Sequence, residues 1–226
     1  KMVRENFIIA IDGFSSCGKS TVAKALAKTL NFVFVDSGAM YRAVTLYFLR
    51  NAINCSDTAA VQEALNNIHI DFIPNTEKTQ ILLNGEDVSD EIRQMEVSEM
   101  VSEVSAIKEV RKAMVAQQQQ LGARRNIVMD GRDIGTTVFP DADLKIFMTA
   151  DPLIRANRRL AELLAKGETV TLEEVIENLA HRDHIDSTRE ESPLRQASDA
   201  MVLDNSYMTQ EEQLELVLNK YQSRLK

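Results

Sequence analysis

"GFSSCGKS" (residues 13–20) joins a short apolar run to a stretch with helical periodicity. The run before it, NFIIAIDG (residues 6–13), has the length and the β-branched residues of a buried strand. The stretch after it, KSTVAKALAKTLN (residues 19–31), is rich in good helix formers. The quoted residues fit the pattern G-x-x-x-x-G-K-[ST], which requires this strand–loop–helix context. They therefore predict an α/β fold whose first loop binds phosphate.

The glycines of this loop have a physical purpose. They let the backbone curl so that N–H groups face inward at the N-terminus of a helix and form a nest for anions. Lys19 is expected to reach the β- and γ-phosphates of a nucleoside triphosphate, and the hydroxyl of Ser20 is expected to ligate Mg²⁺. The residues expected to bind the triphosphate are Gly13, Phe14, Ser15, Ser16, Cys17, Gly18, Lys19, Ser20 and Thr21.

Cys17 inside the loop allows two interpretations. A helix N-terminus lowers the pKa of a thiol, which would favour a redox role. Alternatively, a small side chain points away from the nest while its amide N–H works. We favour the second interpretation.

The bulk composition limits the partners of the chain. Its formal net charge is −8, which argues against a nucleic-acid or membrane binder that relies on bulk positive charge. Any anionic ligand must therefore be bound by local arginines. Two cysteines, Cys17 and Cys55, are too few for a disulfide framework and indicate a reducing compartment. The first apolar run is too short for a signal peptide or a membrane span, so we expect a cytoplasmic protein.

Strand and helix signals alternate along most of the chain. FVFVDSG (residues 32–38) and AMYRAVTLYFLRN (residues 39–51) read as a second strand and a second helix, and this βαβ rhythm predicts a parallel sheet. Asp151 before Pro152 is a typical N-cap, and Thr171 with Glu174 fits a capping box. The further strands and helices are expected in NIVMDG (126–131), LKIFMT (144–149), DPLIRANRRLAELLAKG (151–167), AMVLDN (200–205) and QEEQLELVLNKYQSRLK (210–226).

The rhythm breaks from about residue 51 to residue 90. IHIDFI (68–73) and TQILLNG (79–85), joined by PNTEK (74–78), predict an antiparallel hairpin in a small insertion. EVSEMVSEVSAIKEVRKAMVAQQQQLG (96–122) then predicts one long helix that stops near Gly122. We expect its QQQQ segment (117–120) to form a solvated face.

Two classes of P-loop protein fit these observations, a small-molecule kinase and a nucleotide-switched binding protein. A guanine switch needs N-K-x-D and D-x-x-G elements, and neither occurs in the chain. A kinase needs arginines around a second anion site. DSGAMYR (36–42) and MDGRDIG (129–135) place polar and charged residues just after predicted strands, where open parallel sheets bind ligands. RDHIDSTR (182–189) adds two arginines and an aspartate at i, i+4 and i+7 on one helix face.

Six segments, in order and over nearly the whole chain, resemble the bacterial cytidylate kinases of the type 1 subfamily. They are IDGFSSCGKS (11–20), DSGAMYR (36–42), GEDVSDEIR (85–93), DGRDIGTTVFPDADLKIF (130–147), RDHIDSTR (182–189) and SDAMVLD (198–204). The chain departs from the family's common G-P-S-G-A-G-K loop at Phe14, Ser16 and Cys17, and from its common lid residues at His184 and Ile185.

The resemblance implies an enzyme that moves the γ-phosphoryl group of ATP to CMP or dCMP with Mg²⁺, and it assigns roles to particular residues. Ser102, Arg111, Asp133 and Arg189 would frame the cytosine, Arg182 and Asp186 the ribose, and Arg42 and Arg132 the monophosphate, with Ser37 and Tyr41 lining the site. Arg155, Arg158 and Arg159, at i, i+3 and i+4 on one helix face, would close over the ATP phosphates. The implied catalytic residues are Lys19, Arg132, Arg158 and Arg182, and Asp130 or Asp36 would hold a water of the Mg²⁺ ion.

The implied architecture is the three-layer nucleoside monophosphate kinase fold in a monomer. Its core would comprise residues 1–50, 98–154 and 196–226, with a monophosphate-binding insertion at 51–97 and a helical lid at 155–195. The remaining alternative is a P-loop kinase for another small acceptor, such as UMP or an alcohol. His69, His181 and His184 show no metal-ligand pattern with the cysteines.

Overall fold

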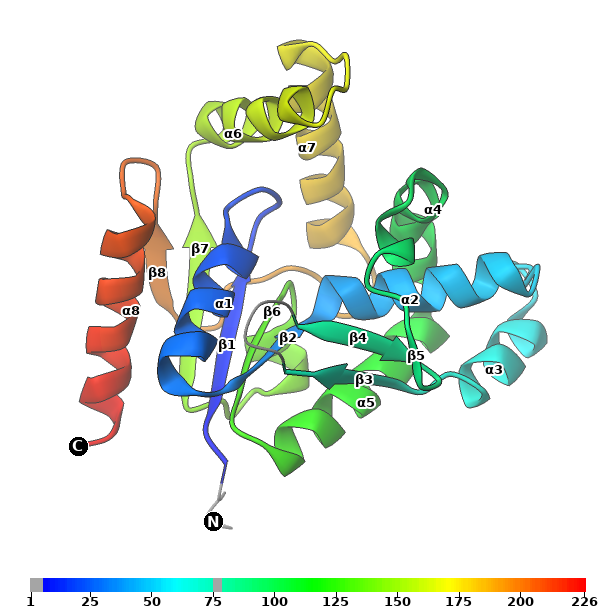
Figure 1. Ribbon diagram of the computed structural model, residues 1–226, viewed down its shortest axis with the longest axis horizontal. Helices are drawn as coiled ribbons and strands as arrows, with labels where there is room; N and C mark the ends of the chain where they lie inside the picture. Colours follow the sequence, from blue (N-terminus) through cyan, green and yellow to red (C-terminus); the bar gives the residue numbers. More distant parts are fainter. Residues whose placement is uncertain (1–5, 75–78) are drawn as a thin grey trace.

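A computed structural model describes residues 6–74 and 79–226. Its centre is a parallel five-stranded sheet with the strand order β2-β6-β1-β7-β8 (Figure 1). The predicted parallel sheet is confirmed. The strands are β1 (Ile8–Gly13), β2 (Val33–Asp36), β6 (Ile127–Gly131), β7 (Leu144–Thr149) and β8 (Met201–Asp204).

Helices cover both faces of this sheet because its central strands are apolar on both sides. Along β1, Ile9 and Ile11 pack in one apolar cluster with α1 and α8, while Ile8 and Ala10 pack in the other with α2 and α5. The result is a three-layer α/β arrangement, as the resemblance implied. The helices of these layers are α1 (Lys19–Leu30), α2 (Ser37–Arg50), α5 (Lys108–Arg124) and α8 (Gln210–Arg224).

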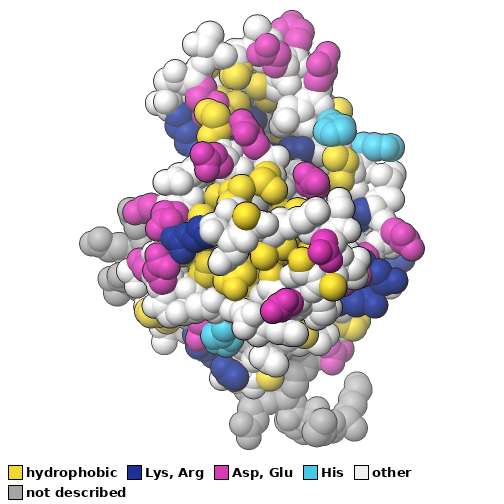
Figure 2. Space-filling model, turned by 90° about the vertical axis from the view of Figure 1, so that its right-hand side faces the viewer, with side chains coloured by type: hydrophobic (Ala, Val, Ile, Leu, Met, Phe, Trp, Pro, Cys, Tyr) yellow, Lys and Arg dark blue, Asp and Glu magenta, His cyan; other side chains and the backbone are white. Residues whose placement is uncertain are grey.

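The segment between α2 and α5 contains the predicted antiparallel hairpin. Strand β3 (Ile70–Ile73) pairs with β4 (Gln80–Leu83), and β4 pairs with the short β5 (Glu86–Asp87). Of the predicted connection PNTEK, residues 75–78 lie outside the described residues. Helix α3 (Thr58–Asn66) and the 3₁₀ turn η1 (Glu91–Arg93), which we did not predict, complete this part. Figure 2 shows this side of the molecule, where hydrophobic side chains gather in the centre of the face among scattered charged groups.

The single long helix predicted for residues 96–122 is wrong. The chain forms α4 (Met95–Ala106) and then α5, because Ile107 adopts extended angles of φ −67° and ψ 124° between them. The predicted stop near Gly122 holds to within two residues, because α5 ends at Arg124, but Gly122 itself lies inside the helix. A Cβ at this position would lie 2.5 Å from the ring of Phe139, so the glycine allows close packing inside the helix.

The predicted solvated face of the QQQQ segment is right for Gln119 and Gln120, which are exposed, and wrong for Gln117 and Gln118. Gln118 is completely buried, and Gln117 donates to the backbone carbonyl of Ile68 at 2.8 Å and accepts from the N–H of Ile70 at 3.0 Å. Gln117 therefore attaches α5 to the small antiparallel sheet, whereas the buried amide of Gln118 has no hydrogen-bond partner among the described residues. Composition alone could not distinguish a buried polar contact from a solvated one.

Two helices project beyond the carboxyl ends of the strands, α6 (Pro152–Ala165) and α7 (Leu172–Thr188) (Figure 1). Asp151 caps α6 by accepting from the N–H of Leu153 at 2.9 Å, and Thr171 with Glu174 forms a capping box on α7. Both predicted caps are confirmed. Among residues 6–74 and 79–226, no helix combines the length and the apolar character needed to cross a membrane.

Candidate active site

A pocket opens at the carboxyl ends of the strands, between α2, α4, α5, the turn after β6, and α7. All ten residues that the sequence assigned to the acceptor line this one pocket. Its lining comprises Ser37, Gly38, Tyr41, Arg42, Val101, Ser102, Ser105, Arg111, Gly131, Arg132, Asp133, Arg182, Ile185, Asp186 and Arg189. The sequence did not predict Gly38, Val101, Ser105, Gly131 and Ile185, although Gly38, Gly131 and Ile185 lie within segments that it singled out.

One end of the pocket is built around a buried ion pair. Arg111 donates to Asp133 at 3.0 Å, and both side chains are 2% exposed. Arg111 also donates to the carbonyl of Ser105 at 3.0 Å, and its guanidinium lies 4.6 Å from the centre of the Tyr41 ring. Burial raises the pKa of Tyr41, so its hydroxyl stays protonated. This end therefore presents a fixed acceptor, Asp133, beside fixed donors.

Cations gather at the other end. Arg132 donates to Asp186 at 2.9 Å and to the hydroxyl of Ser15 at 3.3 Å. Arg42 donates to the hydroxyl of Ser98 at 2.9 Å. Burial, and then Arg132, lower the pKa of Arg182 to about 10, while the charge of Asp186 acts in the opposite direction. Among the described residues its guanidinium makes no hydrogen bond and no ion pair within 4 Å. A half-buried arginine whose donors are not taken by a hydrogen bond is suited to bind an anion.

The segment RDHIDSTR (182–189) was predicted to be helical throughout, and its last residue is not. Helix α7 ends at Thr188, and Arg189 follows it in an extended conformation with φ −60° and ψ 147°. Arg189 nevertheless lines the pocket, and it donates to Asp186 at 3.4 Å and to the carbonyl of Ser192 at 2.8 Å. The predicted juxtaposition therefore holds, although the last residue reaches it from beyond the helix.

The phosphate-binding loop connects β1 to α1. Gly18 takes a left-handed conformation at φ +76°, which glycine adopts readily. The ammonium group of Lys19 donates to the carbonyl of Phe14 at 2.7 Å. Burial, and then the neighbouring Arg132, lower the pKa of Lys19 to about 7. The Cys17 side chain is completely buried in the apolar cluster of α1, and burial raises its pKa, so the structure favours the non-redox interpretation of this residue.

Two buried carboxylates, those of Asp130 and Asp12, lie near Lys19 of the phosphate-binding loop. One oxygen of Asp130 is buried and has no hydrogen-bond partner among the described residues. Burial, and then the charge of Asp36, raise the pKa of Asp130. Asp12, which the sequence did not single out, accepts from the N–H groups of Ile134 at 2.9 Å and Gly135 at 2.8 Å. It therefore holds the turn that carries Arg132 and Asp133, and burial raises its pKa to about 6.

The three arginines of α6 have different partners. Arg155 is buried and donates to Asp183 on α7 at 2.6 Å. Arg158 donates to the side chain and to the carbonyl of Asn205, each at 2.9 Å. Arg159 pairs with Glu162 at 3.2 Å and is half-buried. Their common spacing therefore does not give them a common environment.

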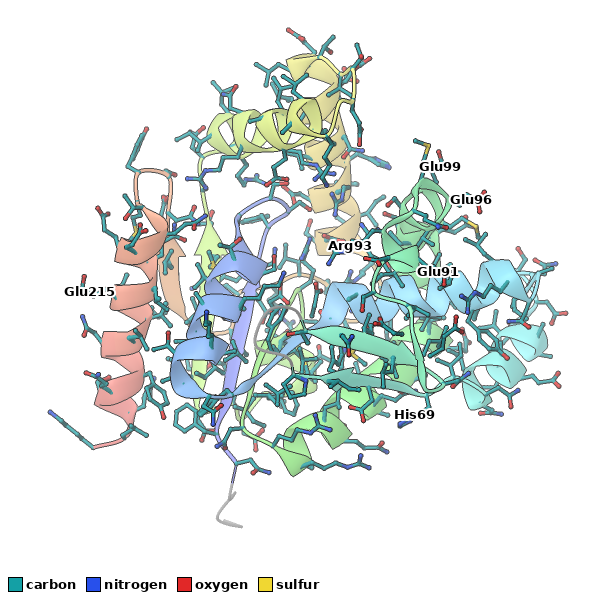
Figure 3. The ribbon with its side chains drawn as sticks, in the orientation of Figure 1. His69, Glu91, Arg93, Glu96, Glu99 and Glu215 are labelled. Atoms are coloured by element: carbon teal, nitrogen blue, oxygen red, sulfur yellow. The ribbon has the colours of Figure 1, made fainter. Side chains whose placement is uncertain are left out.

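Arg93, which the sequence did not single out, is a further cation near this end of the pocket. It is the last residue of η1. Burial, and to a smaller extent the charge of Arg93, lower the pKa of Arg42, while Asp36 acts in the opposite direction. In Figure 3, Arg93 lies near α2 and the base of α4, whereas Glu96 and Glu99 lie on the outer side of α4. The GEDVSDEIR segment was singled out, but no spacing in it distinguished this arginine.

Comparisons with known proteins agree on the family. A model of the cytidylate kinase family matches residues 9–223. A protein named cytidylate kinase from Cytophaga hutchinsonii is 56% identical, with 95% of this chain and 93% of the relative covered. One of the same name from Bacteroides thetaiotaomicron is also 56% identical, covering 94% and 95%.

Solved structures share the fold at low sequence identity. An uncharacterized protein from Eubacterium ventriosum has a TM-score of 0.56 at 13% identity, with 97% of this chain and 99% of that chain covered. TT1252 from Thermus thermophilus has a TM-score of 0.52 at 16% identity, with 98% of each chain covered.

The parallel sheet, the phosphate-binding loop and the arginine-lined pocket beside it define a P-loop kinase. Within that class, the family match and the identities of 56% decide the family. The chain belongs to the cytidylate kinase family. The resemblance seen in the six sequence segments is confirmed, and so is the prediction of a kinase rather than a guanine-nucleotide switch.

Proposed function

We propose that the chain transfers the γ-phosphoryl group of ATP to CMP or dCMP and releases ADP with CDP or dCDP. The observation that carries this proposal is the single pocket that combines the Arg111–Asp133 pair with Arg42, Arg132 and Arg182. The pair supplies an acceptor for the exocyclic amine of cytosine. The three arginines supply positive charge for a monophosphate, in a chain whose net charge is −8.

The acceptor needs no general base in this reaction. The second pKa of a phosphate monoester is about 6, so at neutral pH its oxygens are already ionised and nucleophilic. The difficulty is the approach of two anionic groups in line through a loose transition state. We propose that Lys19, Arg132, Arg158 and Arg182 offset this repulsion, with Arg155 and Arg159 on the donor side.

The residues below the loop are suited to hold Mg²⁺. Hard cations prefer oxygen ligands, and Asp130 offers a buried oxygen without a hydrogen-bond partner among the described residues. We propose that the Ser20 hydroxyl ligates the ion and that Asp130 or Asp36 holds one of its waters. When bound, the ion would neutralise charge on the triphosphate oxygens.

We propose that residues 155–195 form a lid and that residues 51–97 form the monophosphate-binding insertion. The described residues 51–74 and 79–97 do not line the pocket themselves, and the insertion meets it through Arg42, which donates to the carbonyl of Ile92 at 3.4 Å. Support for the lid comes from its separate small apolar cluster, in which Ala156 of α6 packs with Val175 and Leu179 of α7. A unit with its own core can move as one body over the strand ends. Closing it would exclude the water that would otherwise hydrolyse ATP.

We also propose that the enzyme works as a monomer in the cytoplasm. The two cysteines are free, which suits a reducing compartment.

The test is ATP-dependent phosphorylation of a panel of acceptors, comprising CMP, dCMP, UMP, AMP and shikimate, with ADP release as the readout. We expect CMP and dCMP to be the preferred acceptors and shikimate to be inert. An alcohol would need a carboxylate base at the acceptor, and both carboxylates that line the pocket, Asp133 and Asp186, are paired with arginines. A preference for UMP or shikimate would contradict the proposal.

A further inference from the structure

Asp183 of α7 contacts the phosphate-binding loop but does not line the acceptor pocket. One of its carboxylate oxygens accepts from the backbone N–H of Ser15 at 3.1 Å. The other accepts from Arg155 at 2.6 Å. The carboxylate is 15% exposed, so it lies in a largely desolvated position between the loop and α6.

Both donors belong to the set expected to bind the ATP phosphates. Backbone N–H groups of the loop and a buried guanidinium are anion donors, and here one carboxylate engages one of each. Arg132 adds positive charge nearby, because it donates to the hydroxyl of Ser15 at 3.3 Å, but its other hydrogen bond to a side chain goes to the carboxylate of Asp186. The anion that engages the Ser15 N–H and Arg155 in the structure is Asp183.

Arg155 does not depend on Asp183 for its position. It also donates to the carbonyl of Ser15 at 3.1 Å and to that of Ala150 at 3.3 Å, and it lies 5.2 Å from the centre of the Phe14 ring. Loss or movement of the carboxylate would therefore leave the guanidinium beside the loop, ready for another anion.

We infer that Asp183 takes the place of the terminal phosphate of ATP at the Ser15 N–H and Arg155, and that ATP must displace it. The inference rests on the proposed function and adds a residue to its donor site. Two anions cannot share these donors without strong repulsion in a poorly solvated site. Arg182 and Asp186 flank Asp183 on α7, so displacing it moves the residues that would hold the acceptor. Asp183 is thus a positioning residue that connects the two nucleotide sites.

The experiment compares nucleotide affinities of charge-removing variants by titration calorimetry. Asp183→Asn keeps the size of the side chain and removes its charge. We expect it to bind the Mg²⁺ complex of the β,γ-imido analogue of ATP about fivefold or more tightly than the wild type, because the competing charge is gone. ADP lacks the terminal phosphate, and its affinity should change less than about twofold.

Glu177→Gln is the matched control, because it removes one carboxylate from an exposed position on the same helix. It should leave both affinities unchanged. Asp183→Ser also removes the charge and should show the same preference for the triphosphate, so the result does not depend on the folding of one variant.

Equal or weaker binding of the analogue by both Asp183 variants would overturn the inference. Equal tightening for ADP would also overturn it, because the carboxylate would then not act at the terminal phosphate. If the wild type binds neither nucleotide, the proposed function fails instead. The two failures are therefore distinguishable.

Discussion

Replacing Asp133 by asparagine tests the assignment of the base-binding end of the pocket. Asp133 is the acceptor expected to receive the exocyclic amine of cytosine, and it is held by Arg111 at 3.0 Å with both side chains 2% exposed. Uracil carries a carbonyl in place of that amine. The asparagine amide could donate to this carbonyl, so the substitution removes a charged acceptor for one base and adds a donor for the other.

The magnitude follows from the loss of one charge-assisted hydrogen bond. Such a bond contributes about 1.5–3 kcal/mol, and about 1.36 kcal/mol corresponds to a tenfold change in rate. We therefore expect kcat/KM for CMP to fall about 10- to 150-fold, while kcat/KM for UMP stays the same or rises. The CMP:UMP ratio should thus fall by at least about tenfold. Removing one partner of a buried pair also lowers stability, here by about 3 kcal/mol in the free energy of unfolding.

The assay measures ADP release with CMP and with UMP on the same preparation, and urea unfolding gives the stability change. Asp199→Asn is the control, because Asp199 pairs with the buried Lys145 at 2.9 Å and does not line the pocket. This variant should keep the CMP:UMP ratio. If Asp133→Asn loses stability but keeps the ratio of the wild type, Asp133 only holds Arg111, and its role toward cytosine is refuted.

The remaining predictions concern the cations and the two thiols. Arg132→Ala and Arg182→Ala should each lower kcat/KM at least about tenfold with an unchanged circular dichroism spectrum, because a well-placed donor to a developing charge is lost; near-native turnover would remove that residue from the site. The pKa of Lys19 is lowered to about 7, so at pH 8 the amine is mostly neutral, and binding of the β,γ-imido analogue of ATP should take up about one proton. At pH 6 the amine is mostly charged already, so this uptake should be lost, and the partly protonated phosphate, with a second pKa of about 6, should release protons instead. Calorimetry in buffers of different ionisation enthalpy measures this proton uptake. The variant Lys19→Arg should show none. An absence of uptake in the wild type at pH 8 would contradict the assignment of the uptake to Lys19. A thiol reagent should modify the partly exposed Cys55 but not the buried Cys17 in the native chain, and both in urea; rapid native labelling of two thiols would show that the loop opens.

Local sequence signals were sufficient where a short segment carries its own physical reason. The glycine-rich loop needs a strand before it and a helix after it, and both are present as β1 and α1. The caps at Asp151 and Thr171 depend on side chains within three residues of the helix start, and both formed as predicted.

Local sequence patterns gave wrong predictions where the contact that decides the structure involves residues distant in the sequence. Gln118 is buried, and Gly122 fits against Phe139, which comes from another part of the chain. The break at Ile107 lies in a sequence with continuous helical character, and Ile107 packs against the core cluster beneath α2 and α5. No pattern within the segment itself indicates these contacts.

In the candidate site, too, some features could be predicted from the sequence and others required the tertiary structure. The sequence determined the parallel α/β fold and the chemistry of the pocket, because strand order brings segments that follow β2 and β6 to one edge of the sheet. Only the tertiary structure showed that Asp12 holds the turn after β6 and that Asp183 reaches the phosphate-binding loop. Residues 15 and 183 are separated by 168 positions, and hydrogen bonds depend on distance in space rather than along the chain.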